Sequence, residues 1–193
     1  SPEDVLSAQF YLCLFYWEEG EIYEAAILGS YLARNYPESN YAASAAKVAL
    51  VAKEKLYREA SQRGEDTQYE GEQLSEFADY VARRWPESAE AAAAANLLIQ
   101  IALEQDRLSD AEQMLAGLPK SSRASAELNL GSALWTQYLK AIQAGGGQPS
   151  PDAENTRERA AELLASGYEG LDLSATPTTR ELNGVLYYLQ LLL

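Results

Sequence analysis

Three acidic residues near the amino terminus are the first candidates for chemistry. Glu18, Glu19 and Glu21 flank a glycine at the end of the first apolar segment. A carboxylate pair can act as general acid and base, or bind a cation, when a cleft raises the pKa of one member. A position at a helix end favours the alternative that these side chains form a solvated, charged rim. The sequence therefore predicts a structural role for the acidic cluster.

The chain contains no histidine and one cysteine. The absence of histidine excludes Ser-His-Asp and Cys-His nucleophiles and most transition-metal sites. Cys13 lies in an apolar run, where burial keeps a thiol unreactive. The glycines at 145–147 lack the following Lys-Ser/Thr pair of a phosphate-binding loop. These features predict a protein that is not an enzyme and that holds no metal ion and no cofactor.

Asn96 and Gln100 have a spacing that suggests binding instead of catalysis. They interrupt a segment rich in alanine and leucine, although asparagine is a poor helix former. Their four-residue spacing places both amides on one face of a helix. With Lys47, they are predicted to hydrogen-bond a peptide backbone or a carboxylate. The alternative is an ordinary polar stripe on an amphipathic helix.

The segments that carry these residues all have a helical pattern. Apolar residues recur three and four positions apart, and no alternating strand pattern occurs. Ser39 and Ser88 are predicted N-caps that follow Pro37 and Pro86. Polar insertions are expected at 63–70 and 145–152, the second of them a flexible linker. We therefore predict an all-α fold of about nine helices, at about 1–17, 21–35, 40–62, 71–84, 89–105, 109–116, 122–143, 153–166 and 178–193.

One nine-residue phrase occurs twice. Tyr-Leu-Ala-Arg-Asn-Tyr-Pro-Glu-Ser at 31–39 returns as Tyr-Val-Ala-Arg-Arg-Trp-Pro-Glu-Ser at 80–88. Such an echo is typical of stacked helical repeats, which commonly serve as binding scaffolds. We therefore predict a solenoid of antiparallel helix pairs in a single domain, 1–193. Its repeats are expected at about 1–38, 39–87, 88–120 and 121–170, with a partial repeat at 175–193.

The helix pairs resemble those of the tetratricopeptide-repeat family. The family pattern is W-x2-L-G-x2-Y, then A-x3-F, then P. Its positions are occupied in the first pair by Leu12, Cys13, Tyr16, Ala25 and Pro37, and in the fourth pair by Leu130 and Gly131. No repeat has the tryptophan, and two carry insertions. The junction at 35–42 also resembles the junctions of tetratricopeptide proteins of the bacterial envelope.

The resemblance implies a concave groove that is lined by the first helix of each pair and holds a peptide or helix of a partner protein. Aromatic anchors, amides and lysines would make the contacts. In the family register, the groove residues are Phe10, Leu14, Trp17, Lys47, Val51, Glu54, Lys55, Asn96, Gln100, Glu104, Leu128, Ser132 and Trp135.

The final helical segment is apolar on nearly every side. Within residues 185–193, Gln190 is the one strongly polar side chain. A helix this apolar must be covered. Leu186, Leu189 and Leu192 are therefore predicted to meet either a continuation of the chain or a second copy in a homodimer. Burial of the helix within this chain is a third alternative.

Charge limits the partners. The net charge of −14 repels nucleic acid, so no nucleic-acid role is expected. No uncharged apolar run reaches the ~20 residues that span a bilayer, so no direct membrane insertion is expected.

The family likeness suggests a bacterial protein of the periplasm or envelope, or of the cytoplasm. The expected function is a non-enzymatic scaffold for protein–protein interaction. The alternative is a structural or assembly subunit of a bacterial envelope complex that associates through the final helix.

Overall fold

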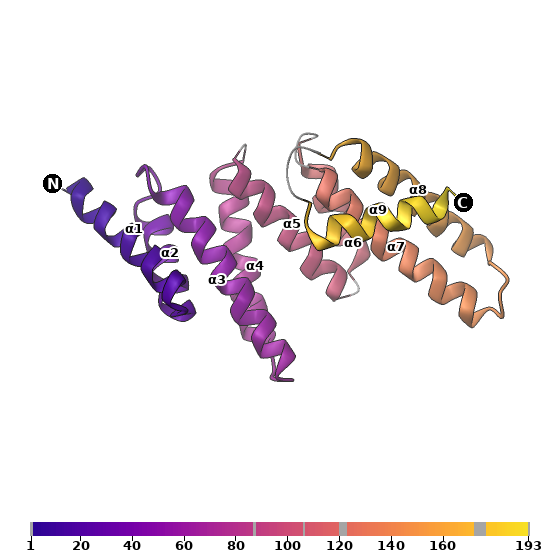
Figure 1. Ribbon diagram of the computed structural model, residues 1–193, viewed down its shortest axis with the longest axis horizontal. Helices are drawn as coiled ribbons and strands as arrows, with labels where there is room; N and C mark the ends of the chain where they lie inside the picture. Colours follow the sequence, from indigo (N-terminus) through magenta and orange to yellow (C-terminus); the bar gives the residue numbers. More distant parts are fainter. Residues whose placement is uncertain (1, 87, 106, 120–122, 172–176, 193) are drawn as a thin grey trace. The chain divides into compact units, whose positions relative to one another are not determined.

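The computed structural model describes residues 2–86, 88–105, 107–119, 123–171 and 177–192 (Figure 1). Over these ranges the chain forms nine α-helices and no strand, so the all-α prediction is confirmed; the solenoid arrangement stays a prediction. The helices are α1 (Pro2–Glu19), α2 (Ile22–Asn35), α3 (Ala42–Gln62), α4 (Gln68–Arg84), α5 (Ala89–Glu104), α6 (Leu108–Gly117), α7 (Ala124–Ala144), α8 (Pro151–Glu169) and α9 (Thr179–Leu191).

The chain divides into two compact units, residues 1–95 and 96–193, and the division falls within α5. In the first unit, α2 and α3 form the most closely packed pair, and α1 and α4 pack against them. Gly29 permits this close approach. A Cβ atom at position 29 would lie 2.7 Å from the backbone oxygen of Ala45 and 3.0 Å from Cβ of Ala49. The alanines of α3 complete a contact in which the two backbones nearly touch.

The two helices that carry the repeated phrase end in the same backbone conformation. Helix α2 ends at Asn35 and α4 at Arg84, two residues before Pro37 and Pro86. Tyr36 follows α2 with φ −131° and ψ 51°. Trp85 follows α4 with nearly the same angles, φ −130° and ψ 61°. The predicted role of the prolines as helix stops is therefore confirmed.

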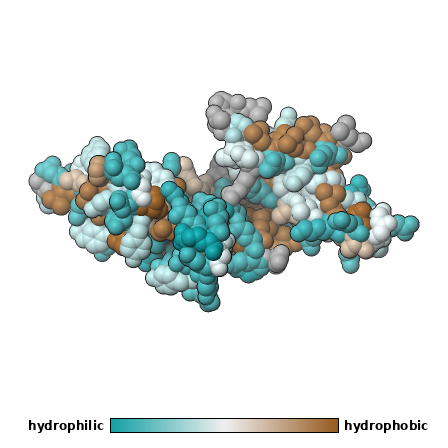
Figure 2. Space-filling view, turned by 60° about the horizontal axis from the view of Figure 1, so that its bottom comes forward, coloured by the Kyte–Doolittle hydropathy of each residue, from teal (hydrophilic) through white to brown (hydrophobic). Residues whose placement is uncertain are grey.

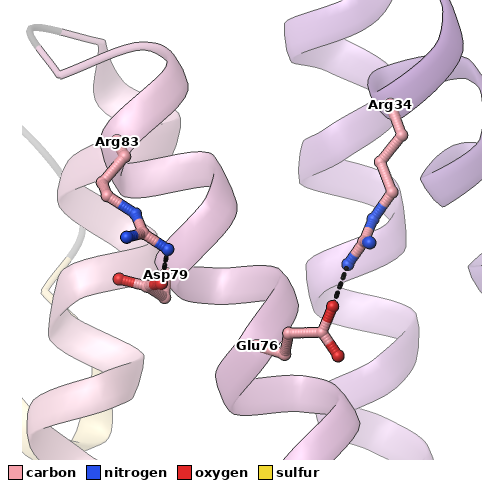
Figure 3. A network of polar contacts seen from close by, with 4 residues as sticks. All are labelled: Arg34, Glu76, Asp79 and Arg83. Atoms are coloured by element: carbon pink, nitrogen blue, oxygen red, sulfur yellow. Dashed lines mark hydrogen bonds and ion pairs between the residues drawn. The ribbon is translucent and has the colours of Figure 1, made fainter.

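The two copies of the phrase also contact each other. The hydroxyl of Tyr80 donates a hydrogen bond to the backbone oxygen of Ala33 (2.8 Å), and Arg84 forms an ion pair with Glu38. Figure 3 shows a further link between the same helices, in which Arg34 of α2 reaches Glu76 of α4 at 3.1 Å. Residues of the two copies, together with Glu76, thus join the end of α2 to α4.

The turns after the two phrases differ. Ser88 caps α5 as predicted, because its Oγ accepts a hydrogen bond from N of Ala91 (3.0 Å). Ser39 does not cap α3: its Oγ is buried without a partner, and N of Ala42 donates to its backbone oxygen instead (3.1 Å). The prediction that Ser39 is an N-cap was wrong, because two further turn residues separate it from the helix.

Both predicted insertions are shorter than expected. Helix α4 already begins at Gln68, so the first connector spans 63–67. The second spans 145–150, because Oγ of Ser150 accepts a hydrogen bond from N of Ala153 and caps α8. Gly147 adopts φ 93° and donates from N to the oxygen of Ile142 (2.9 Å). Residues 145–147 of the second connector therefore form a hydrogen-bonded turn, and the flexibility of the connector stays a prediction.

In the second unit, α7 packs against both α8 and α9. Leu128 of α7 is fully buried between two glycines. A Cβ atom would come within 2.9 Å of Leu128 at Gly167 of α8 and also at Gly184 of α9. The absence of two side chains therefore lets both helices close on the same leucine.

A capping box fixes the start of α9. Thr178 and Glu181 exchange side-chain and backbone hydrogen bonds, and Glu181 also accepts a hydrogen bond from Ser125 of α7. Burial disfavours the carboxylate of Glu181, but the hydrogen bonds from Ser125 and Thr178 outweigh it and lower the pKa. The cap thus also ties α9 to α7.

None of the described helices combines the length and the apolar character needed to cross a bilayer.

Candidate functional site

A polar groove runs along α7 in the second unit. Its volume is about 700 Å³. Leu103 of α5 and Leu108 of α6 form an apolar wall, and Asn183 and Tyr187 of α9 contribute to the lining. We call this the α7 groove. Its remaining lining comes from one stripe of α7: Asn129, Ser132, Ala133, Thr136, Gln137 and Lys140.

The α7 groove presents hydrogen-bonding groups that the described part of the chain does not use. The hydroxyls of Ser132 and Thr136 donate to backbone oxygens one turn earlier on α7, at 2.6 and 2.9 Å. The side-chain amides of Asn129, Gln137 and Asn183 take part in no hydrogen bond with the described residues. Each amide offers both a donor and an acceptor, which matches the alternation of N–H and C=O along an extended peptide.

The charge of the α7 groove differs from that of the whole chain. Among the described residues, its lining includes no carboxylate and one charged side chain, Lys140, although the net charge of the chain is −14. These lining residues therefore do not repel an acidic segment.

The match to the tetratricopeptide pattern predicted groove residues on a neighbouring face of α7. Ser132 lines the groove as expected, but Leu128 and Trp135 are buried instead. The ring of Trp135 stacks on Tyr138 at 5.2 Å, and its Nε1 is buried without a hydrogen-bond partner. Since one residue turns a helix by about 100°, a register error of one position moves the predicted stripe into the core.

Asn96 and Gln100 do not lie on an open polar face. Gln100 is buried, and its Nε2 donates to Glu104 at 2.7 Å. Asn96 is half-buried, and its Oδ1 is buried without a hydrogen-bond partner. Both residues belong to the second unit, whereas Lys47 is exposed on α3 of the first. The structure thus shows a partly buried amide pair where the sequence predicted a peptide contact.

The groove residues predicted in the first unit do come together in part. The ring of Phe10 stacks on Tyr41 at 5.4 Å, and Nζ of Lys55 lies 5.8 Å from the ring centroid of Trp17. Leu14 is half-buried and Val51 is exposed. Aromatic side chains of α1 thus contact Lys55 of α3 and Tyr41, the residue that precedes α3.

The residues considered for chemistry have the surroundings that the sequence predicted. Glu18, Glu19 and Glu21 are exposed. Cys13 is fully buried, and its Sγ donates to the backbone oxygen of Ala25 at 3.5 Å. Burial raises the pKa of the thiol to about 11, so the nucleophilic thiolate is scarce at neutral pH.

The final helix leaves one apolar stripe exposed. Leu182, Leu186, Leu189 and Leu192 follow one another at intervals of four, three and three residues, and are between 48 and 64% exposed. We call them the α9 stripe; hydrophobic surface along α9 is visible at the upper right of Figure 2. Gly184 and Tyr188 face the other way, against α7 and α8. The third alternative, burial of the final helix within this chain, is thus wrong for this stripe.

Comparison of the chain with protein-family models, with curated proteins and with solved structures found no match.

Proposed function

We propose that this chain is a non-enzymatic scaffold that binds an extended peptide segment of a partner protein in the α7 groove. The observation that carries the proposal is the row of unused amides, Asn129, Gln137 and Asn183, along a groove of about 700 Å³. That volume lies within the range of about 300–1,000 Å³ that is typical of ligand sites. The tetratricopeptide resemblance supports the same function.

The proposed mode of binding combines apolar contact with backbone recognition. Leu103 and Leu108 provide a wall for an apolar side chain. The amides on α7 and α9 would pair with peptide groups, and Lys140 would interact with an acidic side chain or a carboxyl end. None of these contacts makes or breaks a covalent bond.

A random 12-residue phage-displayed peptide library, selected on the full chain, would test the proposal. We expect enriched peptides to bind the parent chain and to lose affinity when Gln137 is replaced by alanine. The expected loss is about two- to tenfold, because one neutral hydrogen bond contributes about 0.5–1.5 kcal/mol. Isothermal calorimetry with one synthetic peptide measures the change in Kd.

Gln143→Ala is the matched control for Gln137→Ala. Gln143 is an exposed glutamine of the same helix and lies outside the groove lining. We expect its replacement to leave the Kd unchanged. Equal binding by the parent and both variants would show that the peptides bind elsewhere, and failure to enrich any peptide would contradict the proposed function.

A second candidate function is that of a structural or assembly subunit that associates through the α9 stripe. The stripe itself favours this function, because a row of four exposed leucines is the kind of surface that associates. Residues 179–193 contain two charged residues, Arg180 and Glu181. Two copies can therefore meet along α9 without bringing many carboxylates together, despite the net charge of −14.

Replacement of Leu186 and Leu189 by glutamine tests the second candidate. If the stripe is a self-association surface, the parent chain has about twice the 21.2 kDa of one copy and the double variant has the mass of one copy. Multi-angle light scattering measures the masses. Leu139→Gln, at an exposed leucine of α7, is the control and should keep the mass of the parent. A monomeric parent would rule out self-association through α9.

A further inference from the structure

The first unit contains a separate pocket between α2, α3 and α4. Its volume is about 260 Å³. Ala26 and Ile27 of α2, with Leu56 and Ala60 of α3, form an apolar floor. Tyr23 of α2 and Tyr69 of α4 stand at its rim, both largely exposed. We call this the α2–α4 pocket. It is smaller than the pockets of drug-sized ligands and suits a single bulky side chain.

Lys53 supplies a cation that has no carboxylate partner among the described residues. Its Nζ lies 5.6 Å from the ring centroid of the buried Phe77, and the guanidinium of Arg34 lies at the same distance from that ring. Arg34 pairs with Glu76, as Figure 3 shows. Burial and the neighbouring Arg34 lower the pKa of Lys53, and Glu76 opposes this effect. The ammonium group is thus partly desolvated and would gain from an acceptor.

Glu70 supplies the complementary group. Its Oε2 atom is buried and has no hydrogen-bond donor. A buried acceptor without a donor is destabilising, so a ligand that supplies an N–H would relieve that cost. Lys53 and Glu70 line the same pocket. The pocket therefore combines an apolar floor with one partly desolvated ammonium donor and one buried acceptor that has no donor.

We propose that the α2–α4 pocket is a second recognition site, which takes one bulky apolar residue of an extended segment of a partner protein. The side chain would rest on Ile27 and Leu56 between the two tyrosines. The peptide groups that flank it would accept from Lys53 and donate to Glu70. This complementarity favours a peptide residue over a purely apolar group, because an apolar group would leave the Glu70 acceptor without a donor and would cover the Lys53 ammonium without replacing its water. The site belongs to the first unit and is independent of the α7 groove.

The minimal probe for this site is N-acetyl-phenylalanine N-methylamide, which carries one aromatic side chain and both flanking peptide groups. Titrated into the full chain with labelled methyl groups, it should shift the resonances of Ile27 and Leu56 with roughly millimolar affinity. The alanine analogue should shift them far less, because it cannot fill the apolar floor. Methyl shifts confined to Leu103 and Leu108, in the α7 groove, would overturn the proposal.

Two variants test the polar half of the site. Lys53→Met and Glu70→Met keep a side chain of similar length and remove the donor or the acceptor. Each should weaken binding of the phenylalanine probe roughly tenfold. Lys47→Met is the matched control, since Lys47 is an exposed lysine of the same helix and does not line the pocket. Its affinity for the probe should equal that of the parent.

A third variant keeps the proposal testable if either polar variant folds poorly. Ile27 is half exposed, so Ile27→Ser should fold and yet lose most of the binding. Parent-like affinity in Ile27→Ser, or in a folded Lys53→Met, would overturn the proposal. So would light scattering that shows the chain to be self-associated and the probe to dissociate it, because a second copy would then be the occupant.

Discussion

Replacement of Phe77 by alanine is expected to lower the free energy of unfolding by about 3–5 kcal/mol, the cost of a large core truncation. Phe77 is fully buried in the first unit. Its ring also lies beneath two cations, Arg34 and Lys53, so the cavity would remove the surface on which they rest. Urea unfolding in a Trp135→Phe background would measure the loss, because Trp17 and Trp85 then report on the first unit alone.

Tyr69→Ala is the control for Phe77→Ala. Tyr69 is an aromatic residue of the same helix, but it is 69% exposed. Its truncation should change the free energy of unfolding by less than about 0.5 kcal/mol, as is usual for surface substitutions. If Phe77→Ala lowered the free energy of unfolding by less than about 1 kcal/mol, Phe77 would not be packed in the core of the first unit as described.

Replacement of Gly29 by alanine is the substitution with the next largest expected effect. The added methyl group would lie 2.7 Å from the backbone oxygen of Ala45, so α2 and α3 would have to separate. Such overpacking costs about 1–3 kcal/mol. The loss should appear even though alanine favours a helix by about 1 kcal/mol over glycine. The same fluorescence-monitored unfolding measures the change.

Gly117→Ala is the control for Gly29→Ala, and it should not destabilise the chain. Gly117 is the last residue of α6, and a Cβ atom placed there would meet nothing within 4 Å. Its replacement should leave the stability of the second unit unchanged or raise it slightly, because alanine reduces the conformational freedom of the unfolded chain. Gly117 and Trp135 both belong to that unit, so urea unfolding followed by Trp135 fluorescence in a Trp17→Phe, Trp85→Phe background measures the change. Equal effects of the two substitutions would show that interhelical contact does not set the cost at Gly29.

The sequence predicted the helices well where local chemistry determines their ends. Pro37 and Pro86 stop α2 and α4, and Ser88 caps α5, because each acts within one turn of its own position. Ser39 failed as a cap although it occupies the same place in the phrase as Ser88. Helix α5 begins directly after Ser88, whereas two residues separate Ser39 from α3, so the shared Pro-Glu-Ser sequence alone does not predict the cap.

The site was harder to predict than the fold. The polar stripe of α7 from Asn129 to Lys140 is visible in the sequence at helical spacing, and it could have located the groove without any family register. The register selected Trp135 instead, which is buried. The α2–α4 pocket has no comparable signal, because its residues come from three helices and only packing brings them together.

Helix α9 contributes to two surfaces at once. It supplies Asn183 and Tyr187 to the α7 groove and exposes the α9 stripe on a neighbouring face. A partner that binds these leucines and a peptide that enters the groove would therefore contact the same helix. Any shift of α9 caused by one ligand would change the affinity for the other, and thermodynamic linkage makes the two effects equal. The scaffold and the assembly subunit would then be coupled through one helix.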